Sequence, residues 1–275
     1  MSLNHVAEVV VQSAGLYREP SASAPLETEV LFGERVRVLE VGTADWVQVT
    51  TKLDAYTGYL RAKYLLPADM RSPTHLVSVA QMALYREPNF KSASTEDIVL
   101  PMNARVSVFE TAETPEGLMF DVSGLGWAFV DQVRPIDAYV PDFVAEASKL
   151  LGTAYRWGSR SRGFVDCSSL VQAGCIAAGI PCPRDVSQQV GTLGEAISFA
   201  SDFSNLLRGD LVFWTHKKGR HVAIMIDTTN VLHATIAPPH RGAVIQPLQN
   251  VIADQARDGN GPVTAVRRFP DYEPA

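Results

Sequence analysis

One five-residue segment occurs twice in the first half of the chain, as Leu16-Tyr-Arg-Glu-Pro20 and as Leu84-Tyr-Arg-Glu-Pro88, 68 residues later. Repetition at a fixed offset is the sequence sign of a duplicated structural unit. We therefore predict two homologous units, in residues 8–67 and 76–135.

Each unit consists of short segments in which apolar and polar residues alternate, as in Arg35 to Val41, with turn residues between them. This pattern predicts short β-strands. The segments that begin at Gly58 and Gly126, and end near Pro67 and Pro135, resemble the final strand and short turn of bacterial SH3-like domains. The resemblance implies two small SH3-like β-barrels, which we place at residues 1–70 and 71–136.

Composition and charge disfavour several classes of partner. With 46% hydrophobic and 20% charged residues, the 275-residue chain has the composition of a globular protein. Residues 1–136 carry 17 acidic and 11 basic side chains, and residues 137–275 carry 13 of each. We therefore expect no nucleic-acid partner. We also expect no membrane partner and a cytoplasmic location, because no leader or long apolar run is visible. The sequence makes no prediction of the oligomeric state.

The periodicity changes after Pro135. Pro141 to Leu151 has apolar residues at helical spacing and is followed by Gly152, which predicts an amphipathic helix. A second helical pattern begins at Cys167, within the segment Gly-Phe-Val-Asp-Cys-Ser-Ser-Leu, and stops at Gly179. Strand patterns follow, so we predict an α+β domain over residues 137–275.

The chain has three cysteines, Cys167, Cys175 and Cys182, which cannot all pair with one another. Cys175 lies on the apolar stripe of the helix and Cys182 follows its end, so we interpret both as structural. Cys167 lies in the first helical turn, where free N–H groups and the helix dipole lower the pKa of a thiol. The spacings do not resemble a zinc site, and we expect no metal. We predict that Cys167 is a nucleophile.

A thiolate nucleophile needs a base and a group that orients the base. His221 starts an apolar strand pattern, residues 227–230 form a turn, and His233 lies in the returning segment. The pattern predicts adjacent antiparallel strands. The two histidines share a face only if the hairpin closes through an odd-numbered loop. The alternatives are two structural histidines or a Cys/His zinc site.

Five motifs together resemble the NlpC-type cell-wall peptidases, which are papain-like cysteine peptidases with a Cys-His-His catalytic set. In chain order they are Tyr155-Arg-Trp-Gly158, Asp166-Cys-Ser-Ser-Leu170, Arg208-Gly-Asp-Leu-Val-Phe-Trp214, His221-Val-Ala-Ile224 and Leu232-His-Ala234. The resemblance covers residues 140–268. It implies a papain-like peptidase fold without a cofactor.

The resemblance also implies a role for each matching residue. Cys167 attacks the carbonyl, His221 accepts and returns the proton, and His233 orients the His221 ring. Tyr155 and the backbone N–H of Cys167 stabilise the oxyanion. Trp157 shapes the pocket wall.

Together with two SH3-like units, the chain resembles the YkfC-type γ-D-glutamyl-L-diamino acid endopeptidases. These cut murein stem peptides after D-Glu and require a free N-terminal L-Ala, so the site must hold an ammonium group. Asp166 is the leading candidate, with Ser168 beside it. The alternative for Asp166 is a helix cap.

Other candidates lie in the loop after the second helix and in the first SH3-like unit. Arg184, Asp185 and Ser187 are candidates for the ammonium end or for a substrate carboxylate, and Asp185 has the same helix-cap alternative. Tyr56 is favoured over Tyr17 as the SH3-like residue that closes the cleft, because a Tyr-x-Gly turn resembles the closing position.

We expect the protein to cleave murein-derived peptides during peptidoglycan recycling. The choice between L-lysine and meso-diaminopimelate stays open. The alternatives are an exported hydrolase that acts on polymeric cell wall through SH3-like targeting modules, and an inactive binding protein on the same scaffold. An amidase or acyltransferase with the same residues is a further alternative.

Overall fold

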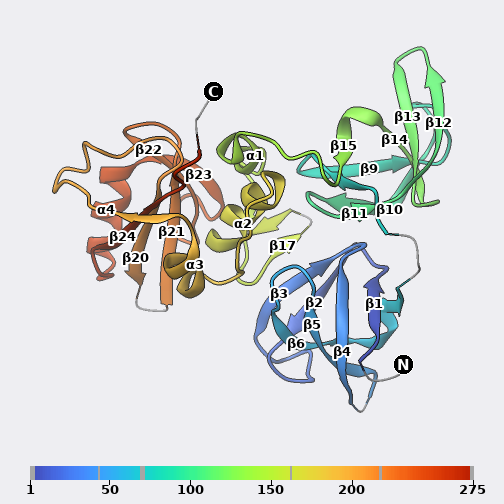
Figure 1. The fold of residues 1–275 in the computed structure, drawn as a ribbon, viewed down its shortest axis with the longest axis horizontal. Helices are drawn as coiled ribbons and strands as arrows, with labels where there is room; N and C mark the ends of the chain where they lie inside the picture. The colour runs from blue at the N-terminus through green and yellow to red at the C-terminus, as the bar shows by residue number, and fades with distance from the viewer. Residues whose placement is uncertain (1–3, 43, 69–71, 162, 217–218, 273–275) are drawn as a thin grey trace. The chain divides into compact units, whose positions relative to one another are not determined.

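The computed structural model describes residues 4–42, 44–68, 72–161, 163–216 and 219–272. It divides into two compact units (Figure 1). Unit 1 comprises residues 1–138 with 161–163, and unit 2 comprises residues 139–160 with 164–275. The predicted boundary between residues 70 and 71 lies outside the described residues, and the division into three domains stays a prediction.

The first repeat of unit 1 forms a seven-stranded sheet in the order β3-β2-β6-β5-β4-β1-β7. The predicted strand at Arg35–Val41 is confirmed, and its antiparallel partner is the strand that starts at Trp46. The elements are β1 (Val6–Val9), β2 (Ser13–Tyr17), β3 (Leu26–Leu31), β4 (Arg35–Val41), β5 (Trp46–Thr51), β6 (Thr57–Arg61), the 3-10 turn η1 (Ala62–Tyr64) and β7 (Leu65–Pro67).

The second repeat forms a five-stranded sheet in the order β10-β9-β14-β13-β12 and a three-stranded sheet in the order β11-β8-β15. Its final strand and turn correspond to those of the first repeat at the predicted offset. The elements are β8 (His75–Val77), β9 (Gln81–Tyr85), β10 (Ser94–Pro101), β11 (Arg105–Val106), β12 (Val108–Thr114), β13 (Gly117–Val122), β14 (Gly126–Phe129), the 3-10 turn η2 (Val130–Gln132) and β15 (Val133–Pro135).

Each repeat has its own apolar core. Leu16 and Leu65 are buried in the first core, and Leu84 and Val133, 68 residues later, are buried in the second. The repeated segment therefore contributes equivalent positions to two separate cores.

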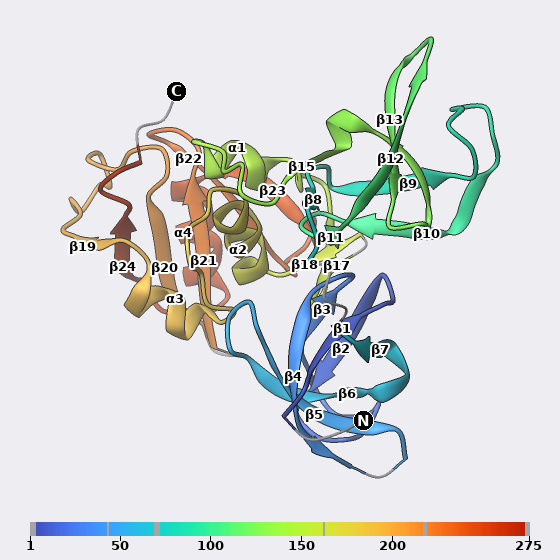
Figure 2. The same cartoon turned by 45° about the vertical axis from the view of Figure 1, so that its right-hand side comes forward.

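Unit 2 is built on a six-stranded sheet in the order β19-β24-β20-β21-β22-β23, with every neighbouring pair antiparallel (Figure 2). A small second sheet has the order β16-β18-β17. The strands are β16 (Ala154–Tyr155), β17 (Arg160–Ser161), β18 (Phe164–Val165), β19 (Glu195–Ile197), β20 (Leu211–His216), β21 (Gly219–Met225), β22 (Asn230–Ala234), β23 (Ala243–Pro247) and β24 (Val263–Arg268).

Both predicted helices of unit 2 are present. The helix predicted from Pro141 to Leu151 is shorter, because α1 (Phe143–Ser148) ends in a series of turns. The predicted helix at Cys167 is α2 (Cys167–Ala177), which packs on α1. A Cβ atom at Gly174 of α2 would lie 2.3 Å from the Phe143 carbonyl oxygen, so this close packing requires glycine.

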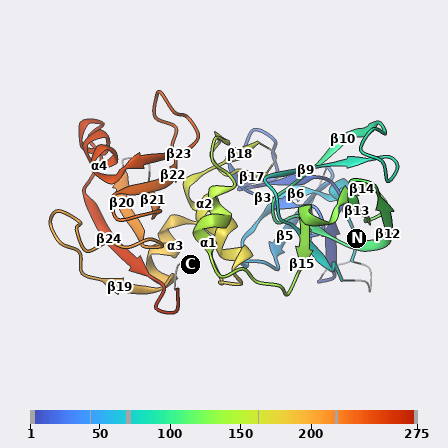
Figure 3. The same ribbon diagram turned by 90° about the horizontal axis from the view of Figure 1, so that it is seen from above.

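The sheet of unit 2 carries helices on both faces. Ala223 and Met225 of β21 share a core with Leu248 of α4 (Leu248–Arg257), whereas α2 packs on β21 and β22 from the other side (Figure 1, Figure 3). Side chains alternate along a strand, so His221 lies on the same face of β21 as Ala223. Helix α3 (Val186–Thr192) packs against β21 and β24. Within the described residues, none of the helices has the length and apolarity needed to cross a membrane.

Candidate active site

Cys167 is the first residue of α2, and Asp166 is its N-cap. The Asp166 carboxylate accepts a hydrogen bond from the Ser169 backbone N–H at 2.9 Å, and the Ser169 hydroxyl accepts one from the Asp166 N–H at 2.9 Å. This capping box fixes the start of the helix. The Cys167 side chain lines a cavity of about 510 Å³ that His221 also lines. The structure thus brings the predicted nucleophile and the predicted base together.

The predicted lowering of the Cys167 pKa is wrong. Burial raises the pKa of the thiol to about 12, and the negative charge of Asp166 adds to the rise. The backbone N–H groups of Val222 and Ser168 and the charge of Arg184 oppose it. The helix N-terminus therefore acts in the predicted direction, but burial outweighs it. The free protein holds a thiol, and the base must remove its proton.

The histidine arrangement is confirmed. Strands β21 and β22 are antiparallel, with Met225 opposite Val231, so the hairpin closes through the five residues between them. This odd-numbered loop places His221 and His233 diagonally on one face. Their rings meet at 3.0 Å, from His221 Nε2 to His233 Nδ1.

Gln246 completes a hydrogen-bonded chain behind the base. Its Oε1 lies 2.8 Å from His233 Nε2. An amide oxygen only accepts hydrogen bonds, so His233 carries its proton on Nε2. Burial lowers the pKa of His233, which keeps this ring neutral with a bare Nδ1. His221 Nε2 donates to that atom, which leaves the lone pair on His221 Nδ1 as the base.

Sequence reasoning missed Gln246. It is a polar residue in the otherwise apolar strand β23, and this was the available signal. Gln246 lies opposite Val231 on β22, diagonal to His233. Only the pairing of β22 with β23 shows that the amide faces the histidine.

Tyr155 also lines the cavity that contains Cys167. It belongs to β16, which pairs in parallel with β18 and so lies next to the strand that leads into α2. Burial raises the pKa of the Tyr155 hydroxyl, and the negative charge of Asp166 raises it further. The hydroxyl therefore stays protonated and can donate a hydrogen bond.

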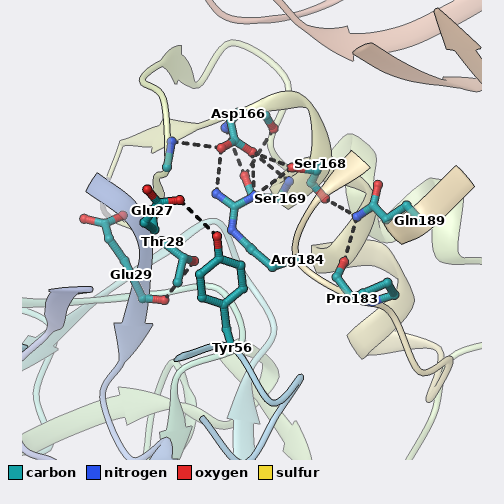
Figure 4. A network of polar contacts seen from close by, with 11 residues as sticks. Glu27, Thr28, Glu29, Tyr56, Asp166, Ser168, Ser169, Pro183, Arg184 and Gln189 are labelled. Atoms are coloured by element: carbon teal, nitrogen blue, oxygen red, sulfur yellow. Dashed lines mark hydrogen bonds and ion pairs between the residues drawn. The ribbon is translucent and has the colours of Figure 1, made fainter. Parts of the chain in front are cut away.

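Asp166 forms a buried ion pair with Arg184. Figure 4 shows the two terminal nitrogens of Arg184 directed at the carboxylate, with Nη2 to Oδ2 at 2.6 Å and Nη1 to Oδ1 at 3.0 Å. Nη1 also donates to the Ser168 hydroxyl at 2.7 Å, and the Gly158 N–H donates to Asp166 Oδ2 at 2.9 Å. The cap alternative for Asp166 is confirmed. Its role as an ammonium partner stays a prediction, and the structure places its charge against a buried guanidinium.

The other predicted binding residues lie at several places. Trp157 lines the cavity, whereas Asp166, Ser168, Arg184, Asp185 and Ser187 are not among its lining residues. Asp185 is the N-cap residue of α3, without a side-chain cap hydrogen bond, and Ser187 is exposed. The binding roles of these residues stay predictions.

Tyr56 belongs to unit 1 and is half-buried there. Its hydroxyl donates to Glu27 Oε2 at 3.1 Å (Figure 4). Its predicted place at the cleft stays a prediction. Among the described residues, no group of three or more His, Cys, Asp or Glu side chains could hold a metal ion.

Family comparisons agree with the architecture. Residues 152–254 match the NlpC/P60 family, and residues 16–65 match the bacterial dipeptidyl-peptidase Sh3 domain. A crystal structure of an NlpC/P60 family protein from Bacillus cereus superposes with a TM-score of 0.73 at 22% identity, covering 96% of this chain and 99% of that one. The prediction of an NlpC-type papain-like peptidase domain with an SH3 domain is confirmed.

Two curated relatives match most of the chain. Dipeptidyl-peptidase 6 of Lysinibacillus sphaericus is 27% identical over 248 residues, which cover 84% of this chain and 88% of the relative. Gamma-D-glutamyl-L-lysine dipeptidyl-peptidase of Bacillus cereus is 27% identical over 243 residues, which cover 81% of this chain and 71% of the relative.

Proposed function

Because the chain carries an NlpC/P60 domain and a bacterial dipeptidyl-peptidase SH3 domain, we propose that it is a cysteine endopeptidase of murein stem peptides. It cleaves the bond between γ-D-Glu and the L-diamino acid in peptides with a free N-terminal L-Ala. The observation that carries the proposal is the hydrogen-bonded chain from Gln246 through His233 to His221, beside Cys167 in one cavity. The names of the two relatives support the substrate class.

The first step forms a thioester. The Cys167 thiol gives its proton to His221 Nδ1 as Sγ attacks the γ-carbonyl carbon of D-Glu. Transfer accompanies attack because burial keeps the thiol protonated beforehand. His233 accepts the hydrogen bond from His221 Nε2 and so stabilises the imidazolium that forms. His221 then returns the proton to the departing nitrogen, the C–N bond breaks, and the diamino acid leaves.

The negative charge of the tetrahedral intermediate needs donors. The Tyr155 hydroxyl and the backbone N–H of Cys167 supply them, and one such donor contributes about 3 kcal/mol in comparable sites. In the second step a water molecule gives its proton to His221 and attacks the thioester carbon. Sγ leaves, regains the proton, and L-Ala-D-Glu is released.

In this mechanism, Asp166 holds the N-terminal turn of α2 in position. Its carboxylate oxygens accept from the Ser169 and Gly158 backbone N–H groups and from Arg184, so it holds α2 and the Tyr155 loop in register. Binding of the substrate ammonium by Asp166 and Ser168 is the second role that we propose for these residues.

We also propose that residues 71–136 form a second SH3-like module. Strand β14, turn η2 and strand β15 repeat the order of β6, η1 and β7, and each repeat has its own apolar core. The excess of acidic residues in residues 1–136 disfavours binding of anionic wall polymers. These modules restrict the enzyme to short, released peptides, and the enzyme acts in recycling in the cytoplasm.

One assay tests this function. L-Ala-γ-D-Glu-diamino acid peptides and their N-acetylated forms are incubated with the protein, and L-Ala-D-Glu is measured by mass. We expect cleavage of the free peptide alone and none of intact sacculi. Equal cleavage of the acetylated peptide would contradict the free-amine requirement. If Asp166→Asn cleaves the free peptide and keeps this discrimination, Asp166 serves only as cap and ion-pair partner.

A further inference from the structure

The cavity beside Cys167 is rich in positive charge. Arg156 and Arg220 line it, and within the described part of the chain no Asp or Glu does. Both arginines are exposed. Among the described residues, neither guanidinium forms an ion pair with a carboxylate. Two arginines in one cavity that form no ion pair within the described part of the chain favour an anionic ligand group.

The arrangement of the strands shows which part of a substrate this cavity receives. His221 returns a proton to the departing nitrogen, so the leaving group must lie against His221. Arg220 directly precedes His221 on β21, and Thr235 and Ile236, which follow His233 along the chain, also line the cavity. The histidine side of the cavity is therefore the side of the departing diamino acid.

Gln255 adds an oriented donor. It lies on α4, is buried, and lines the same cavity. Its Oε1 accepts a hydrogen bond from Asn260 Nδ2 at 2.9 Å, which leaves the NH2 group of Gln255 as the part able to donate to a ligand.

Apolar surface accompanies these donors. Trp157 and Ile236 line the cavity and are 59% and 60% exposed. Exposed apolar groups next to guanidinium groups suit a ligand with an aliphatic chain that ends in a carboxylate.

We propose that Arg220, Arg156 and Gln255 form the subsite of the departing residue and bind its side-chain carboxylate, so that the enzyme prefers meso-diaminopimelate to L-lysine. The two residues carry the same aliphatic chain and ammonium group, and only meso-diaminopimelate ends in an additional carboxylate. The inference rests on the proposed function, because it assigns a subsite of that reaction.

A pair of peptides isolates this carboxylate. L-Ala-γ-D-Glu-meso-diaminopimelate and L-Ala-γ-D-Glu-L-Lys, each amidated at the α-carboxyl of the third residue, differ only at the end of the side chain. Release of L-Ala-D-Glu gives kcat/KM for each peptide. We expect the diaminopimelate peptide to be preferred by about tenfold or more, since hydrogen bonds between charged groups are stronger than neutral ones.

Two variants locate the effect. Arg220→Gln should reduce kcat/KM for the diaminopimelate peptide about tenfold while changing the lysine peptide little. Gln255→Glu should also reduce the preference for the diaminopimelate peptide, because the introduced carboxylate would repel the side-chain carboxylate of that peptide. Arg37→Gln removes an exposed arginine of unit 1 and is the charge-matched control, with the wild-type preference expected. Thermal unfolding of each variant checks that the fold is retained.

The possible outcomes separate the two proposals. Equal cleavage of both peptides by the wild type, or an equal loss for both in Arg220→Gln, overturns the subsite and leaves the proposed function in place. Cleavage of neither peptide, in amidated or free-acid form, overturns both. A preference for the lysine peptide contradicts the charge of the cavity directly.

Discussion

His221 Nε2 lies 3.0 Å from His233 Nδ1, across two antiparallel strands. This contact also determines the tautomers of the two rings, because the other ring nitrogen of His233 donates a hydrogen bond to Gln246. His221 and His233 therefore each have one defined tautomer, and in His221 the nitrogen without a proton is Nδ1. A base whose tautomer is already fixed needs no change of tautomer before it accepts the proton of the thiol.

Gln246→Leu removes the acceptor that fixes the His233 tautomer. We expect kcat to fall about tenfold to a hundredfold, the size of effect seen when the hydrogen-bond partners of metal-bound histidines are mutated, with KM little changed. Gln249→Leu, an exposed glutamine two residues into α4, is the matched control. If kcat is unchanged in Gln246→Leu, the hydrogen bond between Gln246 and His233 does not control the tautomer that catalysis needs.

Gln246→Glu tests the same contact through pH. A carboxylate beside His233 raises the pKa of that ring, and protonated His233 cannot accept from His221. The acid limb of the kcat/KM profile should therefore move to higher pH than in the wild type, in which burial holds the His233 pKa below its usual range. A shift in the opposite direction would contradict the assignment.

The charges of Asp166 and Arg184 should have opposite effects on the pKa of the Cys167 thiol and so on its rate of alkylation. Asp166 raises the pKa of Cys167 and Arg184 lowers it. Asp166→Asn should therefore make Cys167 react faster with iodoacetamide at mildly alkaline pH, and Arg184→Met should make it react more slowly. Mass mapping separates Cys167 from Cys175. Equal changes in both variants would show that their charges do not act on the thiol.

The ion pair between Asp166 and Arg184 should also affect the free energy of unfolding. Arg184 is 1% exposed, so removing it leaves the Asp166 charge buried without a counterion. We expect Arg184→Met to lower the free energy of unfolding by about 3–5 kcal/mol. The double variant Asp166→Asn with Arg184→Met should recover part of this loss, because asparagine still caps the helix. Urea denaturation at neutral pH measures both, and no recovery in the double variant would speak against the buried-charge explanation.

Tyr155→Phe removes one proposed oxyanion donor and keeps the ring. We expect kcat to fall about a hundredfold to a thousandfold, with a small change in KM. Tyr139→Phe, at a tyrosine that is 64% exposed, is the control. Steady-state kinetics on the free tripeptide would show the difference, and a loss confined to KM would assign Tyr155 to binding instead.

Local patterns predicted much of this molecule. The 68-residue repeat, the helix that begins at Cys167 and the histidine hairpin depend on periodicity and turns, which lie within short stretches of sequence. Because side chains alternate along a strand, the odd number of residues in the loop is enough to place His221 and His233 on the same face of the sheet.

Long-range contacts were not predictable in this way. Gln246 reaches His233 only because β23 pairs with β22, and Arg184 is buried against Asp166 from 18 residues further along the chain. The pKa of Cys167 was predicted in the wrong direction for the same reason. Its helix position is local information, but its burial depends on the packing of α2 against β21.

The central claim is that Cys167 forms a thioester with the γ-carboxyl of D-Glu. Rapid acid quenching of the protein with L-Ala-γ-D-Glu-meso-diaminopimelate, followed by peptide mapping, measures this intermediate directly. We predict an L-Ala-γ-D-Glu adduct on Cys167, no adduct on Cys175, and no turnover in Cys167→Ala alongside retained turnover in Cys175→Ala. Release of L-Ala-D-Glu by Cys167→Ala, at the wild-type rate and without any adduct, would contradict the claim.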